Sequence, residues 1–178
     1  MAETCAECGF SWDLKPPDAI VAIRSFARRY QAPLTRFLPD EDGAAILRAH
    51  PIEGTWSALE YACHVRDVFA LYQRRIEQAQ VHDDPEAEPM DPDGAVVEGR
   101  YDEQDPAEVA AAIAANANAL ADVMDGIPLA GWGRAVVRRG ERLTCEGMAA
   151  NVVHEGSHHL LDIGRVMRAA REAAKAKG

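Results

Sequence analysis

The sequence lacks a long apolar run, an N-terminal leader and an excess of basic charge. No run approaches the ~20 apolar residues that span a membrane. The first residues, 1–5, show no basic segment followed by an apolar one, which excludes a recognisable signal peptide. We therefore expect a cytoplasmic protein that does not bind a membrane. Among the 178 residues 19 are basic and 29 acidic, giving a formal net charge of -10. This balance excludes a dedicated nucleic-acid binder, whose affinity comes mainly from Lys and Arg that neutralise phosphates.

Cysteine is also scarce, and only one CxxC pair occurs. Cys5 and Cys8 are followed by a glycine, as in half of a zinc ribbon or knuckle, but no second CxxC supplies two further ligands. One interpretation is a zinc clip that is completed by Cys63, Cys145 or a histidine. The other is a pair of reduced thiols on a loose terminus. The sequence alone favours neither.

Apolar residues recur at steps of three and four in four long segments, and this spacing predicts four amphipathic helices. The first begins at Pro16 and is interrupted near Ala32 by Pro33. The other three are expected from near Trp56, with Ser57 and Glu60 as a capping box or Thr55 as the cap; from Asp105 to near Gly126; and from the Thr144 cap to about Ala174.

The connections have no clear period. Residues 80–105 are acidic and proline-rich, residues 129–142 are irregular or weakly extended, residues 44–49 favour a short helical turn, and no strand ladder is expected. The prediction is an all-α chain: a four-helix bundle over residues 16–178, preceded by a short CxxC-containing extension over residues 1–15. Spare apolar faces on such a bundle would allow a homodimer.

The spacing of histidines predicts a metal site. His154 and His158 are four residues apart, so on a helix they stand on the same face and both reach one divalent ion. His64, on the second long helix, is the expected third ligand. A catalytic zinc commonly takes three protein ligands and keeps one position open, so zinc is the first choice. Nickel, cobalt and iron are alternatives because they also accept imidazole.

Two stretches resemble the DinB-like superfamily: Trp56-Ser57-Ala58-Leu59-Glu60-Tyr61-Ala62-Cys63-His64, and His154-Glu155-Gly156-Ser157-His158-His159 about ninety residues later. The resemblance implies a four-helix bundle with His64, His154 and His158 as metal ligands. It also implies relatives that use the thiols mycothiol or bacillithiol. The mycothiol-linked isomerase group is similar but has Glu-x-x-x-His on its fourth helix, whereas His154 is taken here as the first position.

The resemblance favours a thiol S-transferase or isomerase that acts on a small electrophile. Mycothiol is the expected thiol, because three lysines against sixteen arginines and abundant alanine are typical of a GC-rich genome. One alternative is a hydrolase that uses metal-activated water, with Glu60, Asp67 or Glu155 as the base. The other is a non-catalytic metal-binding or stress-response protein, whose histidine site Cys5 and Cys8 would close.

Overall fold

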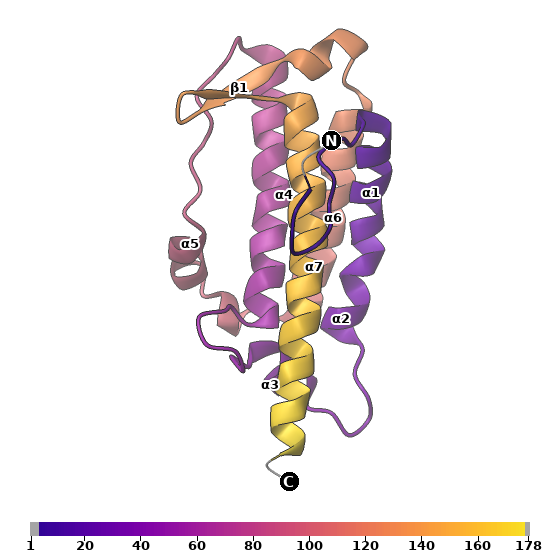
Figure 1. Cartoon of the computed structure of the whole chain (residues 1–178), viewed down its shortest axis with the longest axis vertical. Coiled ribbons are helices and arrows are strands. Elements are labelled where there is room, and N and C mark those ends of the chain that lie inside the picture. The colour runs from indigo at the N-terminus through magenta and orange to yellow at the C-terminus, as the bar shows by residue number, and fades with distance from the viewer. Residues whose placement is uncertain (1–3, 177–178) are drawn as a thin grey trace.

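The computed structural model describes residues 4–176 and contains four long helices (Figure 1). They are α1 (Pro16–Arg29), α4 (Ala58–Val81), α6 (Pro106–Asp125) and α7 (Cys145–Lys175). Both α1 and α4 pack against α6 and against α7, so the order around the bundle is α1, α6, α4, α7. This arrangement confirms the predicted all-α four-helix bundle. Within the described residues no helix is both long and apolar enough to cross a membrane.

The helix ends follow the signals in the sequence. Ser57 accepts a hydrogen bond from the Glu60 backbone N–H at 3.2 Å, and the Glu60 carboxylate accepts one from the Ser57 N–H at 2.6 Å, which completes the capping box. The Asp105 side chain caps α6 by accepting from the Ala107 and Glu108 N–H groups, and Thr144 caps α7 by accepting from the Gly147 N–H. The first helix breaks at Tyr30, and a short α2 (Gln31–Thr35) follows. Pro33 explains the break, because it has no N–H to continue the helix ladder.

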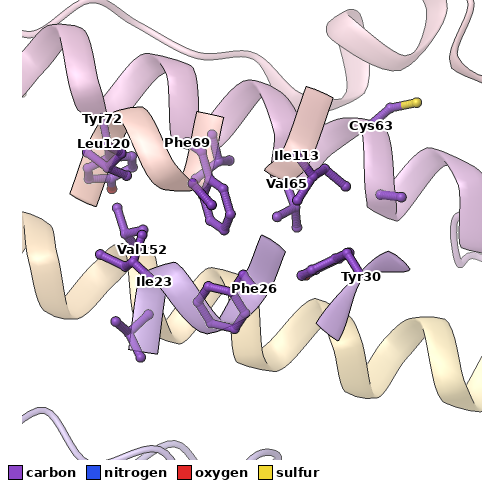
Figure 2. Close-up of a cluster of buried hydrophobic side chains, with 14 of the residues drawn as sticks. Ile23, Phe26, Tyr30, Cys63, Val65, Phe69, Tyr72, Ile113, Leu120 and Val152 are labelled. Atoms are coloured by element: carbon purple, nitrogen blue, oxygen red, sulfur yellow. The ribbon is translucent and has the colours of Figure 1, made fainter. Parts of the chain in front are cut away.

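A cluster of buried aromatic and aliphatic side chains fills the centre of the bundle (Figure 2). Phe26 of α1 lies against Phe69 of α4, with ring centroids 5.6 Å apart. The Tyr30 hydroxyl donates a buried hydrogen bond to the Gly156 carbonyl at 2.8 Å. A Cβ at Gly156 would lie 2.6 Å from the Phe26 ring, so glycine is what lets α7 approach α1 this closely. The core thereby fixes which face of α7 turns inward.

The connections hold more structure than expected. Short helices occupy α3 (Gly43–Arg48), α5 (Pro92–Glu98), η1 (Tyr101–Glu103) and η2 (Leu129–Gly133). Of these only α3 was predicted, as the helical turn over residues 44–49. The expectation that no strand ladder exists is wrong, because β1 (Ala135–Arg138) pairs antiparallel with β2 (Glu141–Thr144). Arg139 and Gly140 join the strands with φ of 53° and 81°, as a two-residue turn of this hand requires.

The N-terminal segment, residues 4–15, lies across the outer face of α7 (Figure 1). It folds back on itself: Thr4 bridges Ser11, the Cys5 N–H donates to the Phe10 carbonyl at 2.9 Å, and the Gly9 N–H donates to the Cys5 carbonyl at 2.9 Å. Gly9 has a φ of 71°, which a glycine adopts without strain. The rings of Phe10 and Trp12 lie 5.5 and 4.8 Å from the His154 ring, so the segment is fastened to α7 by packing as well.

Candidate metal centres

The structure divides the predicted ligands between two clusters, and His158 also belongs to a third with Glu7 and Asp162. In one cluster Cys5, Cys8, His154 and His158 bring one ligand atom each within 4.8 Å of one another. In the other, His64 meets Glu155 and His159 at the same spacing. His64 thus lies with a different pair on α7 from the one expected. The set His64, His154 and His158 stays a prediction, and the grouping of the side chains favours two separate centres.

The division follows from the geometry of α7. Positions 154 and 158 form one pair of residues four apart, and positions 155 and 159 form a second pair shifted by one residue, which is about 100° around the helix. Gly156 marks the inward face. Relative to it, Glu155 and His159 lie about 60–100° away, beside α4, whereas His154 and His158 lie about 160° away, on the outer face. The N-terminal segment packs on the outer pair, whose side chains are 17% and 19% exposed.

The inner cluster has the spacing of an ion site. The carboxylate Oε2 of Glu155 is 3.4 Å from His64 Nε2 and 3.3 Å from His159 Nε2. Two ligand atoms bound tetrahedrally at zinc–nitrogen or zinc–oxygen distances would be about 3.4 Å apart. Two imidazoles and one carboxylate also match a common catalytic zinc set, which leaves the fourth position open. These three residues therefore fit a divalent ion.

Neighbouring groups orient His159. Its Nδ1 lies 3.0 Å from Asp162 Oδ2, which leaves Nε2 free to face Glu155 and His64. Histidines that bind metals usually donate their other N–H to a carboxylate in this way. Burial opposes protonation of His159, but Asp162 and Glu155 raise its pKa to about 9. Burial also opposes ionisation of Glu155, yet His159 and His64 hold the pKa of its carboxyl well below its usual value. The cluster therefore attracts positive charge. Tyr61 stacks on the His159 ring at 5.2 Å.

His64 is held differently. Its side chain is buried beside Trp56, with ring centroids 5.1 Å apart, and its Nδ1 has no hydrogen-bond partner among residues 4–176. Glu60 and Asp67, two of the residues considered above as the base of a hydrolase, have other partners. The Glu60 carboxylate instead caps α4, and Asp67 accepts hydrogen bonds from Arg66 and from the Tyr101 hydroxyl.

A pocket of about 670 Å³ opens beside the inner cluster, and His64 and Glu155 form part of its wall. Three arginines line it, Arg75 from α4, Arg138 at the end of β1 and Arg139 in the turn that follows, together with Glu141 at the start of β2. Arg75 is only 3% exposed, and its buried Nε has no hydrogen-bond partner within the described part of the chain. Pro89 and Met90 also line the pocket, so the acidic connection between α4 and α6 helps to enclose it.

Cys63 and Cys145 do not belong to the cluster that contains Cys5 and Cys8. Cys63 is buried beside the Tyr101 carbonyl and Gln104, and burial raises the pKa of its thiol to about 12. Cys145 accepts a hydrogen bond from Gln80, and burial raises its pKa as well. Of the three completions considered for the CxxC pair, the structure brings histidines to it. Hydrogen bonds from the Cys8 and Glu7 backbones and from His154 lower the pKa of Cys5 to about 6.

Comparison with known proteins agrees with the fold. A family model described as the DinB superfamily matches residues 25–163. The chain belongs to the DinB superfamily. Among solved structures it is similar to YfiT from Bacillus subtilis, with a TM-score of 0.77, 15% sequence identity and 86% of each chain covered. YfiT is described as a probable metal-dependent hydrolase with an unusual four-helix bundle topology. No curated protein matches the sequence.

The sequence pattern does not group Glu155 and His159 with His64, as the structure does. The signal that identifies them is the phase of the apolar stripe on α7. Ala149, Val152, Gly156, Ile163 and Met167 are buried along one face, and residues 155 and 159 flank this face on the side of α4. His154 and His158 have the same spacing but lie one residue earlier, on the outer face of α7, and as two histidines they are the more conspicuous pair in the sequence.

Proposed function

We propose that this DinB superfamily protein is a metal-dependent enzyme that activates a small thiol of the mycothiol type. The thiol is either transferred to a small anionic electrophile or used to isomerise it. The observation that carries the proposal is the convergence of His64, Glu155 and His159 beside a pocket lined by arginines. Zinc is the first choice of ion because two imidazoles and a carboxylate form a common catalytic zinc set.

The protein residues would divide the work as follows. His64 and His159 would offer imidazole nitrogens, His159 after it loses its proton to the incoming ion, and Glu155 would offer a carboxylate oxygen. Asp162 keeps the His159 ring in the orientation that turns Nε2 toward Glu155. A bound divalent ion would supply Lewis acidity that lowers the pKa of a coordinated thiol or water. The pocket beside His64 would hold the electrophile within reach.

The choice of a thiol rests on the spacing of the ligands. Glu155 and His159 form Glu-x-x-x-His on α7. The mycothiol-linked isomerase group has the same pattern on its fourth helix. With Glu155 rather than His154 in the first position, this one difference from the isomerase group disappears, while the family's Arg-Gly-Gln after the last histidine is still replaced here by Leu160-Leu161-Asp162.

The choice of an anionic substrate rests on charge. Arg75, Arg138 and Arg139 face the pocket, and a buried guanidinium with an unpaired N–H favours a carboxylate that accepts from it. Buried polar groups without partners are costly, so an anion that satisfies Arg75 would gain more than a neutral analogue. The expected substrate is a small electrophile that bears at least one carboxylate.

A thiol-consumption assay tests the proposal. Zinc-loaded protein is incubated with mycothiol, bacillithiol or glutathione and a panel of carboxylate-bearing electrophiles, each paired with its methyl ester. We expect turnover with one thiol, a fall of at least ~100-fold in kcat/KM for His64→Ala or Glu155→Gln, and little change for the exposed His82→Ala control. Removing a ligand weakens ion binding in every state of the enzyme, so the stabilisation that the ion gives to the transition state is lost with it. Arg75→Met should raise KM for the acids and not for the esters.

A hydrolase is the second candidate, because YfiT, which shares the fold, is described as a probable metal-dependent hydrolase. It predicts turnover of esters or amides without any thiol and a pH–rate limb near 7 from metal-bound water. Turnover that needs no thiol would therefore replace the first proposal by the second. If the zinc-loaded protein consumed neither thiol nor ester across the panel, the enzymatic proposals would both be wrong and the non-catalytic interpretation would stand.

A further inference from the structure

We propose that Cys5, Cys8, His154 and His158 form a second, structural zinc site, separate from the ion at His64, that fastens the N-terminal segment to α7. Nothing in the DinB fold requires this site, since two of its ligands precede the bundle. It goes beyond the proposed enzymatic function and does not depend on it.

The ligand atoms have the spacing that zinc imposes. All four lie within 4.8 Å of one another, and Cys5 Sγ is 3.7 Å from His158 Nδ1. A sulfur and a nitrogen bound tetrahedrally to one zinc would be about 3.6 Å apart. The residue types also match, because two thiolates and two imidazoles are a standard structural zinc set.

The surrounding groups already satisfy what such a site needs. His158 turns Nδ1 to Cys5 and Nε2 to carboxylates, with Glu7 Oε2 and Asp162 Oδ2 each 3.6 Å away. A metal-bound histidine usually turns its second ring nitrogen toward a carboxylate, and His158 has two carboxylates within ion-pair distance of Nε2. The Nε2 of His154 is buried and has no hydrogen-bond partner in the described range. Leaving a buried nitrogen unpaired is unfavourable, and a metal ion bonded to it would give it a partner.

The backbone of the segment is shaped like a zinc knuckle. The turn over residues 5–10 is closed by two hydrogen bonds between Cys5 and its neighbours Gly9 and Phe10, with Gly9 at positive φ. This turn presents both thiols of the CxxC pair to one point above α7. Phe10 and Trp12 cover the His154 ring and shield that side.

Four protein ligands close the site, and a closed tetrahedral site is structural rather than catalytic. Its role follows from its position. His154 precedes Glu155 and His158 precedes His159, so an ion on the outer face of α7 restrains the helix turn that supplies two ligands of the inner centre. Asp162 contacts both His158 and His159, at 3.6 and 3.0 Å, and links the two centres directly.

Metal analysis of the full chain tests the inference. Protein expressed with zinc should hold two equivalents per chain. The variant Cys5→Ser/Cys8→Ser should keep one, the variant Glu155→Gln/His159→Ala should keep the other, and the buried-thiol control Cys63→Ala should keep both. Cobalt as a probe adds a readout on the native protein that needs no variant. A thiolate-to-cobalt charge-transfer band should appear, persist in Glu155→Gln/His159→Ala and vanish in Cys5→Ser/Cys8→Ser.

Three results would overturn the inference. The first is native protein whose cobalt spectrum has no thiolate band. The second is Cys5→Ser/Cys8→Ser protein that retains both equivalents. The third is loss of both ions on removal of the two cysteines alone, because the clip would then belong to a single shared centre. Conversely, native protein with one equivalent that Cys5→Ser/Cys8→Ser removes and His64→Ala does not would support the structural site while contradicting the proposed catalytic ion.

Discussion

Gly156 is the residue at which α7 and α1 come closest. An alanine Cβ there would lie 2.6 Å from the Phe26 ring, and Phe26 is fully buried and packed against Phe69. Because the ring has no free space to move into, Gly156→Ala should overpack the core. Overpacking costs about 1–3 kcal/mol, against a gain of up to about 1 kcal/mol in helix propensity.

Gly164 provides the matched control on the same helix. A Cβ at this position meets nothing within 4 Å, so Gly164→Ala gains helix propensity without a clash. We expect urea unfolding of the chelator-treated protein to show Gly156→Ala less stable than the native chain by about 1–2 kcal/mol and Gly164→Ala more stable by up to about 1 kcal/mol. Equal effects of the two substitutions would contradict the packing of Phe26 on Gly156.

At the scale of residues, the types of ligand were readable from the sequence but their grouping was not. Residues 154, 155, 158 and 159 can all bind metals, and residues four apart share a helix face whichever pair is chosen. Which pair faces α4 depends on the rotation of α7 about its axis. That rotation is set by Gly156 against Phe26, a contact between helices 130 positions apart in the chain that no local pattern encodes.

Among the elements, α4 depends on its N-cap. Ser57, seven residues before His64, is fully buried. Its hydroxyl accepts a hydrogen bond from the Glu60 N–H. Ser57→Ala would leave that buried N–H without its acceptor, at a cost of about 1 kcal/mol. For a chain of this size we expect the Tm to fall by about 2–4 °C in a thermal scan.

Asp91 caps α5 in the same manner, with its side chain accepting from the Gly94 N–H at 3.2 Å, but α5 has no buried residue. Asp91→Ala should therefore leave the Tm of the bundle nearly unchanged. An equal fall in Tm for Asp91→Ala and Ser57→Ala would contradict the view that α4 belongs to the core and α5 to the surface.

The elements that sequence reasoning missed lie in the connections. Asp91 followed by Pro92 has the form of a cap and a first helical residue, but the acidic, proline-rich composition around it masked the signal. The β1–β2 hairpin turns at Arg139-Gly140 and has strands of four residues, too short for an alternating pattern to stand out. By contrast, the long helices were predicted well because each carries several turns of apolar spacing and a cap.

For the whole molecule, the two centres join segments that are distant in the chain. In the inner cluster His64 of α4 meets Glu155 and His159 of α7, and in the outer cluster Cys5 and Cys8 meet two histidines of α7, so an ion bound at either cluster would join the segments. Ligands that bind only the folded chain stabilise it by about 4 kcal/mol when their free concentration is one thousand times Kd. The unfolded chain has neither arrangement, so each ion should add to the stability of the whole bundle.

We therefore expect zinc to raise the Tm of chelator-treated protein in two additive parts that separate variants can remove. His64→Ala should lose the part that depends on the inner centre, and Cys5→Ser/Cys8→Ser the part that depends on the outer one. Magnesium, which prefers oxygen ligands, should have little effect. Because Asp162 contacts a ligand of each centre, Asp162→Asn should reduce both parts. A zinc response that survives the loss of His64, Cys5 and Cys8 together would contradict both centres.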